Sequence, residues 1–163
     1  EKALRLTGFE PNTAAEALIP KGMSRFYLDE AESLQACIPG AGGVFTARSL
    51  AKIYAALANH GEIDGVRLLS EKTVGELVKV QNRNRGDVVP MAMHWRLGYH
   101  RVFTTWPKTP YAFGHFGYGG SGAWADPSRH LAVGFIVNTG SGSPFADLRI
   151  WKINTAIIEA VGG

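Results

Sequence analysis

The sequence predicts an α+β fold in which an antiparallel sheet is flanked by helices. Helical periodicity is found over about residues 46–60 and again from residue 70, and strand-like segments follow between about 95 and 138. A last helical pattern begins near residue 143. Because strands and helices do not alternate along the chain, a parallel nucleotide-binding sheet is not expected.

The helices of the first half are predicted from their capping residues and apolar stripes. Within residues 8–35, prolines and mixed polarity indicate a loop with a short helix at about 13–18. Thr46 is a suitable N-cap for a helix that runs to about His60, and Gly61 is a suitable left-handed stop. The apolar stripe of that helix comprises Leu50, Ile53, Tyr54 and Leu57.

Two further helices are expected downstream. Ser70 is the expected N-cap of one of them, in which Val74, Leu77 and Val78 are apolar. Ser143 is the expected N-cap of the last helix, and Pro144 would occupy its first position. That helix would cover the sheet.

Three segments have the pattern of strands. In residues 95–103, Trp95, Leu97, Tyr99 and Phe103 alternate with Arg96, Gly98, His100 and Val102, which is typical of a half-buried strand. Residues 111–116 also alternate. The turn at residues 126–129 then leads into residues 131–138, which are apolar on both faces and are expected to be buried on both.

Composition indicates a globular protein. The 163 residues are 45% hydrophobic and 19% charged, and no run of 18 apolar residues predicts a membrane span. The net charge is +3, but the 17 Lys and Arg are scattered, so nucleic-acid binding is not expected. The single cysteine, Cys37, cannot form an internal disulfide, and a buried structural thiol is expected.

Glycine density marks the expected site. Five of the nine residues from Gly114 to Gly122 are glycine. Glycine in a strand costs conformational entropy, so such density indicates a place where another group must approach the backbone closely. His115 lies within this run, and an imidazole can position a substrate group or exchange a proton near neutral pH. The N–H of Tyr118, just after Gly117, could donate to an oxyanion. A histidine that serves only the hydrogen bonding of a tight turn is the structural alternative.

Three other chemistries are disfavoured by the pattern. The histidines do not pair at metal-binding spacing, and one cysteine cannot build a thiolate site, so no protein-ligated metal is expected. Ser49 and Lys52 have the spacing Ser-x-x-Lys, but Lys52 falls about 150° from the centre of its helix's apolar stripe and should face solvent. Ser121 resembles a nucleophile elbow but lacks the final glycine and the following helix.

Two groups of motifs together resemble a known superfamily. They are the stretch from Pro39 to Tyr54 with Asn59-His60-Gly61, and Gly114–Gly122 followed by Ala125-Asp126-Pro127 and residues 133–138. They resemble the C-terminal half of the serine β-lactamase and penicillin-recognising superfamily, with class C β-lactamase-like esterases as the most similar branch. The likeness spans about residues 36–160.

The resemblance implies roles for one strand. His115-Phe116-Gly117 matches the family's Lys/His-x-Gly motif, so His115 and Gly117 would be catalytic and the N–H of Tyr118 would be one oxyanion donor. Phe116, Gly119 and Trp124 would contact substrate. Histidine in place of lysine points to an esterase-like branch, and the reaction implied is acyl transfer from a small ester or amide through an acyl-serine.

The family's remaining motifs are absent from the chain. Neither a nucleophilic Ser-x-x-Lys at the expected place nor a Tyr-x-Asn is found, so we expect residues 1–163 to be a single partial domain whose partner is the N-terminal half of the enzyme. Alone, the chain should be inactive. A non-catalytic binding or regulatory protein that keeps this fold is the alternative. The sequence starts without methionine, so we expect a non-native start, and a cytoplasmic or periplasmic location stays open.

Overall fold

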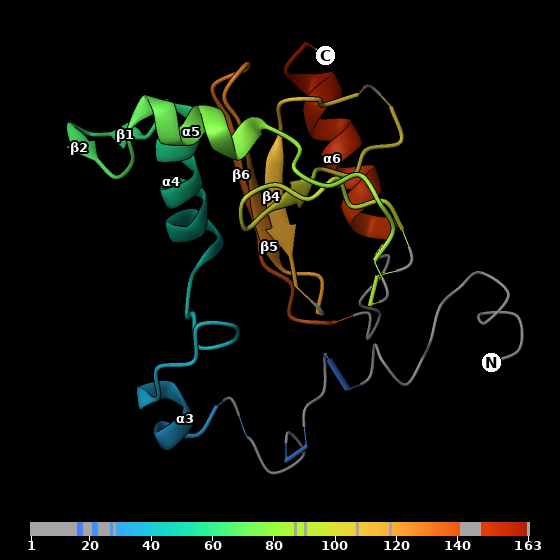
Figure 1. Ribbon diagram of the computed structural model, residues 1–163. Helices are drawn as coiled ribbons and strands as arrows, with labels where there is room; N and C mark the ends of the chain where they lie inside the picture. Colours follow the sequence, from blue (N-terminus) through green and yellow to red (C-terminus); the bar gives the residue numbers. More distant parts are fainter. Residues whose placement is uncertain are drawn as a thin grey trace, which may run out of the picture. The chain divides into compact units, whose positions relative to one another are not determined.

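The computed structural model describes residues 16–17, 21–22, 27, 29–86, 88–89, 91–106, 108–117, 119–140 and 148–162. The chain, which we expected to form one partial domain, divides into two compact units. One comprises Glu1–Phe45 with Asn84–Ala92, and the other Thr46–Arg83 with Met93–Gly163. The second unit contains an antiparallel sheet with helices on both faces, so the predicted α+β class is confirmed (Figure 1).

The first unit has little regular structure among its described residues. Its helix α3 (Ala31–Gln35) lies in a stretch that we expected to be loop, and it buries no residue. Of the helix predicted at about 13–18, only Glu16 and Ala17 are described, and both are helical. Cys37 is exposed, so the expectation of a buried thiol is wrong. The reason is that Cys37 follows a helix that covers no core.

Helix α4 (Ala47–Ala58) opens the second unit and is capped as predicted. The Thr46 hydroxyl accepts the N–H of Ser49, and the Ser49 hydroxyl accepts the N–H of Thr46, which completes a capping box. The helix ends at Ala58, slightly before the expected end, because His60 and Gly61 both adopt positive φ.

A small hairpin, which the sequence analysis missed, joins α4 to the next helix. Strands β1 (Glu62–Ile63) and β2 (Val66–Arg67) pair across Asp64 and Gly65, which both have positive φ, as the tight turn between paired strands requires. Helix α5 (Glu71–Val78) follows, and the Ser70 hydroxyl accepts the N–H of Thr73 as its N-cap.

Among the described residues, the main sheet has four antiparallel strands in the order β3-β4-β5-β6. Their bounds are β3 His100–Arg101, β4 Phe113–Phe116, β5 Gly122–Asp126 and β6 Leu131–Phe135. The strand expected at 95–103 is therefore only two residues long. Residues 131–138 are also less buried than expected: β6 is half-buried and Ile136 is 44% exposed. As the last strand of the sheet, β6 is covered less than an inner strand.

Two apolar clusters cover the two faces of the sheet. On one face, Leu57 and Ala58 of α4 pack with Leu77 of α5 and with Phe113 and Ala125 of the sheet. The backbone of Gly134 lies so close to α4 that a Cβ there would collide with the Ala47 carbonyl.

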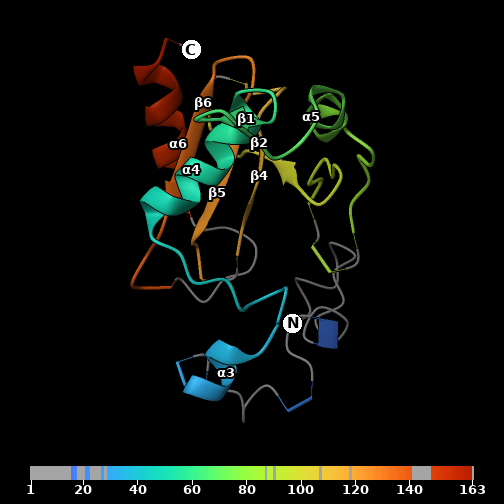
Figure 2. The ribbon, with the colours of Figure 1, turned by 90° about the vertical axis from the view of Figure 1, so that its left-hand side faces the viewer.

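Helix α6 (Leu148–Ala160) covers the other face, as predicted, with Ile158 packed against Val102, Ala112 and Trp124. Figure 1 shows α4 on one side of the strands and α6 on the other. In the turned view, α4 lies in front of the strands (Figure 2). The caps predicted for α6, Ser143 and Pro144, lie outside the described residues. In the part of the chain that the structure describes, no helix combines the length and apolar character needed to cross a membrane.

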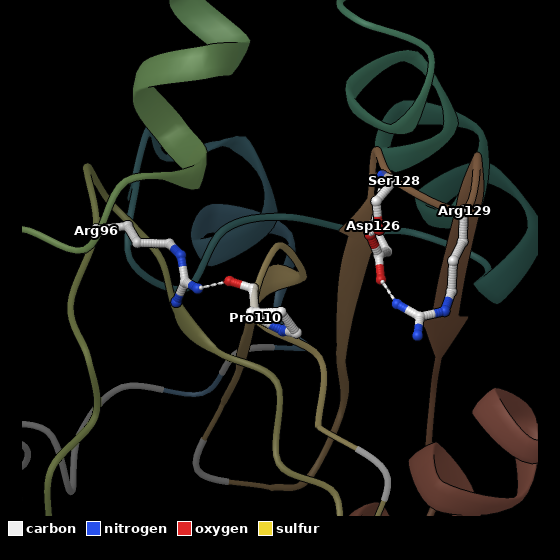
Figure 3. A network of polar contacts seen from close by, with 5 residues as sticks. All are labelled: Arg96, Pro110, Asp126, Ser128 and Arg129. Carbon is white, nitrogen blue, oxygen red and sulfur yellow. Dashed lines mark hydrogen bonds and ion pairs between the residues drawn. The ribbon is translucent and has the colours of Figure 1, made fainter. Parts of the chain in front are cut away.

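The predicted turn between β5 and β6 is held by a buried carboxylate. Asp126 is fully buried, and its Oδ1 accepts the backbone N–H of Ser128 at 3.0 Å and the Ser128 hydroxyl at 2.6 Å. Its Oδ2 pairs with Nη1 of Arg129 at 2.7 Å (Figure 3). This arrangement fixes the hairpin that positions β5 beside β4.

Candidate functional site

The candidate site is the end of β4, where His115 is exposed. His115 pairs with Ala123 of β5, and Phe116 pairs with Gly122. A Cβ at Gly114 would collide with the Ala123 carbonyl, and one at Gly122 would collide with the His115 carbonyl. At these two positions, the costly glycines therefore allow the backbones of β4 and β5 to approach closely.

The other edge of β4 loses its strand partner beside the site. β3 pairs with β4 only through His100 opposite Gly114 and Arg101 opposite Phe113. Beyond Gly114, the His100 side chain takes the place of a neighbouring strand, because its Nε2 accepts the N–H of Phe116 at 3.3 Å. Within the described residues, the edge of β4 at His115 thus has no strand partner, while His100 still holds its backbone.

The two histidines lie in contact. The ring centroids of His100 and His115 are 5.2 Å apart in an edge-to-face arrangement. His100 is only 2% exposed, and its Nδ1 lies 2.7 Å from the carbonyl oxygen of Arg101. Since Nε2 accepts a hydrogen bond, Nδ1 carries the proton and donates it to that carbonyl, which fixes the neutral tautomer.

Burial keeps both imidazoles neutral at pH 7. Desolvation lowers the pKa of His100 to about 4, the bond to the Arg101 carbonyl opposes that shift, and His115, Arg96 and Arg101 add to it. The pKa of His115 is also lowered by desolvation, since neighbouring groups reduce solvent access to the ring although the residue as a whole is exposed. A neutral His115 can accept or relay a proton, which a lysine ammonium at pH 7 cannot.

The other residues predicted for the site differ in their surroundings. Gly117 and Gly119 are exposed next to His115, and the N–H of Gly117 donates to the Ser121 carbonyl at 2.8 Å. Phe116 is half-buried and packs on the apolar cluster under α6. Tyr118, the expected oxyanion donor, lies outside the described residues.

Trp124 does not fit a pocket wall. Its side chain is fully buried, and its Nε1 donates to the Asn154 Oδ1 of α6 at 2.9 Å. This indole is a core group with no surface to offer a substrate, so we do not retain Trp124 among the substrate-binding residues. The alternation along β5 and the pairing of Trp124 with Gly114 explain the difference, because they turn its side chain toward α6.

The two serines that resembled nucleophiles have structural roles. The Ser49 hydroxyl donates to the Thr46 carbonyl at 3.0 Å as part of the helix cap, and Lys52 forms an exposed ion pair of 2.6 Å with Asp64. The solvent-facing position predicted for Lys52 is therefore confirmed. Ser121 accepts the N–H of Val137 at 3.0 Å and is followed by strand β5. No helix follows it, as the rejection of a nucleophile elbow required.

Sequence reasoning missed His100. The alternation in residues 95–103 grouped His100 and Arg96 with the polar set, but both are buried, and Leu97 of the apolar set is exposed. The bend at Gly98, which has φ of 78°, breaks the period before β3 begins. A glycine in the middle of an alternating segment was the signal that could have warned of this.

No group of three or more metal-binding side chains lies together among the described residues.

Comparison with known proteins identifies the family. Residues 3–156 match the Beta-lactamase family, to which the chain therefore belongs. Over 116 residues it is 44% identical to the Esterase/beta-lactamase LipL of Mycobacterium tuberculosis, a match that covers 67% of this chain and 25% of that protein. The superfamily resemblance seen in the sequence is confirmed.

Two solved structures are similar in fold. A penicillin-binding protein homologue from Caulobacter crescentus matches with a TM-score of 0.77 and 31% identity, over 93% of this chain and 41% of that one. A family VIII carboxylesterase matches with a TM-score of 0.56 and 32% identity, over 64% and 29%. The chain thus spans less than half the length of each of these relatives.

Proposed function

We propose that this chain is the C-terminal part of a serine hydrolase that cleaves a small carboxylic ester or amide by acyl transfer. In this proposal, the catalytic serine and its lysine base lie in an N-terminal half that is absent from the chain. The names of two relatives, an esterase/beta-lactamase and a carboxylesterase, favour an ester substrate. The coverage of at most 41% of the matched proteins agrees with a missing half.

The observation that carries the proposal is the open edge of β4 at His115. An exposed, neutral imidazole lies there on a strand whose backbone is fixed by the hydrogen bond from the N–H of Phe116 to His100. His115 would accept or relay a proton near the attacked carbonyl, with Gly117 allowing close approach of the substrate. The N–H of Tyr118 would donate to the tetrahedral oxyanion, together with the N–H of the nucleophilic serine.

The reaction balances without a metal or organic cofactor. The serine oxygen forms a bond to the acyl carbon, and the alcohol or amine leaves with the proton that the serine gave up. Water then attacks the acyl-serine and releases the carboxylic acid. Each addition places negative charge on the carbonyl oxygen, which the two N–H donors stabilise.

The sheet supports the proposal of a missing half. Among the described strands, β6 has a partner only on its β5 side, so its other edge can accept a further strand. Apolar side chains beyond it, such as Ile136, are exposed. We infer that the N-terminal half pairs with or packs on this part of the second unit.

A fluorophosphonate probe tests the proposal. We expect the longer, native protein to gain one adduct on a serine outside residues 1–163, while the isolated chain gains none. Replacing His115 by Ala in the native protein should slow ester hydrolysis about 10²- to 10⁴-fold, the range typical of a positioned acid or base. His130→Asn is a matched control, because His130 is also exposed and asparagine tolerates its φ of 50°.

Two results would contradict the proposal. Labelling at Ser49 would show that the nucleophile lies within this chain and not in an N-terminal half. Failure of the native protein to label or hydrolyse any ester would favour the non-catalytic binding protein, which keeps the fold and lacks the reaction.

A further inference from the structure

A second concave site lies in the same unit and shares no lining residue with the His115 edge. It is a cavity of about 570 Å³ bordered by Arg101 of β3, the loop that follows it and Trp151 of α6. Its volume is in the range of small-molecule sites. Of the described lining residues, none is acidic and five are basic: Arg83, His94, Arg96, Arg101 and Lys108.

Arg96 is a buried cation that has no carboxylate partner in the part of the chain that the structure describes. It is 6% exposed, and its guanidinium donates to three carbonyl oxygens, those of Val78 at 3.0 Å, His94 at 3.2 Å and Pro110 at 2.9 Å. Figure 3 shows the bond to Pro110. Carbonyl dipoles hold the side chain in place but leave its full charge uncompensated.

Arg101 has an unsatisfied donor. Its Nε is buried and has no hydrogen-bond partner among the described residues, which is rare in folded proteins and costly. The guanidinium carbon lies 4.9 Å from the ring centroid of Phe103, and Phe103 in turn stacks on Trp151 at 4.9 Å. Arg101, Phe103 and Trp151 all line the cavity, so a guanidinium and an aromatic wall border it together.

The basic side chains are close enough for each to disfavour the protonated form of its neighbours. Desolvation lowers the pKa of Arg96, and the charge of Arg83 lowers it further. The pKa of His94 is lowered by burial and then by Arg101, Arg83 and Arg96. An anion in the cavity would relieve this repulsion, since within the described residues none of these groups forms an ion pair with an acidic side chain.

We propose that this cavity binds a small aromatic carboxylate. The carboxylate would take the unsatisfied Nε–H of Arg101 and a neighbouring guanidinium N–H in a bidentate pair, the geometry for which arginine is suited. The ring of the ligand would lie against Phe103 and Trp151. This site does not depend on the proposed hydrolase activity, because none of its residues belongs to the His115 edge.

Titration of the full 163-residue chain with sodium benzoate, followed by ¹H–¹⁵N NMR, tests the proposal. The Nε–Hε cross-peak of Arg101 should shift and saturate, and neutral benzamide at the same concentrations should leave it unchanged. Arg101→Gln should weaken benzoate binding at least about tenfold, in line with the loss of a charge-assisted hydrogen bond. The matched control Arg48→Gln removes the same charge at an exposed position of α4 and should bind normally.

The outcomes separate the alternatives. Equal shifts with benzamide would show a merely apolar cavity, and binding of inorganic phosphate without benzoate would show a phosphate site; either result overturns the proposal. So would equal weakening in the Arg101 and Arg48 variants. If Arg101→Gln does not fold, as judged by circular dichroism, Arg101→Lys keeps the charge but lacks the planar pair of donors. It should still weaken binding severalfold.

Discussion

His100 holds the backbone of Phe116 with a side chain rather than with a strand. The imidazole Nε2 accepts the Phe116 N–H at 3.3 Å, and the opposite nitrogen donates to the carbonyl of Arg101 at 2.7 Å. One buried ring therefore replaces the hydrogen bond that a longer β3 would have supplied. The result is an edge of β4 that is fixed in position and yet open at His115.

Removing the acceptor should loosen that edge. His100→Leu leaves the N–H of Phe116 without a partner, and we expect a loss of about 1–3 kcal/mol in the free energy of unfolding. Urea unfolding measures this loss, and amide exchange at Phe116 should become much faster. His100→Gln, which can offer a carbonyl oxygen, should recover part of the protection. Unchanged exchange at Phe116 in the leucine variant would contradict the bond.

The same histidine predicts a pH dependence. The pKa of His100 is about 4 in the folded chain, whereas an unfolded histidine has about 6.5. Between these values, the unfolded state binds more protons, so stability is complete above about pH 6.5 and falls as the pH drops toward 4. The difference in pKa corresponds to a loss on the order of 3 kcal/mol.

Urea unfolding at pH 7, 5.5 and 4.5 checks the sign and the source of this effect. His100→Gln should unfold more easily at pH 7 but should lose less stability on acidification than the natural sequence. His115 also has a lowered pKa, so a smaller acid dependence should persist in that variant. If both proteins lose stability equally between pH 7 and 4.5, His100 is not the titrating group.

The sequence predicted the elements whose signals are local. The caps at Thr46 and Ser70 and the turn at Asp126 are confirmed, because a side chain that bonds the backbone a few residues away needs no tertiary partner. The Asp64-Gly65 turn carried an equally local signal, and the analysis overlooked it.

The interior of the site was harder to predict, since it depends on pairing between distant segments. His115 was found through its glycine neighbours, because the conformational-entropy cost of so many glycines in a strand can be recognised from the sequence alone. His100 and Arg96 were placed with the exposed residues, because alternation fails where a strand bends at Gly98. The register that turns Trp124 toward α6 depends on how β4, β5 and β6 pair in space. The sequence pattern of each strand by itself does not specify that pairing.

The burial of Trp124 predicts a stability effect in place of a substrate effect. Trp124→Phe removes the N–H that Asn154 accepts at 2.9 Å and leaves a buried amide oxygen unpaired. We expect a loss of about 1–3 kcal/mol in urea unfolding, with further loss from the smaller ring. Trp106→Phe is the control, because Trp106 is 68% exposed and should change stability by less than about 0.5 kcal/mol. Equal losses in the two variants would mean that the indole of Trp124 is not held in the core.

The structural contacts of Ser49 and Lys52, one in the helix cap and the other in an exposed ion pair, predict that both residues matter only for stability. Ser49→Ala breaks the reciprocal half of the capping box and should cost about 0.5–2 kcal/mol. Lys52→Met removes an exposed ion pair with Asp64 and should cost less than about 1 kcal/mol.

In the longer enzyme proposed above, neither substitution should reduce fluorophosphonate labelling or ester hydrolysis. The Lys52 ammonium is exposed and paired with Asp64, so it lacks the desolvated environment in which catalytic lysines are found. Stability and labelling are to be measured on the same samples, so that unfolding is not mistaken for lost chemistry. Loss of labelling in a folded Lys52→Met protein would show that this lysine activates a nucleophile, and the purely structural roles assigned to Ser49 and Lys52 would be wrong.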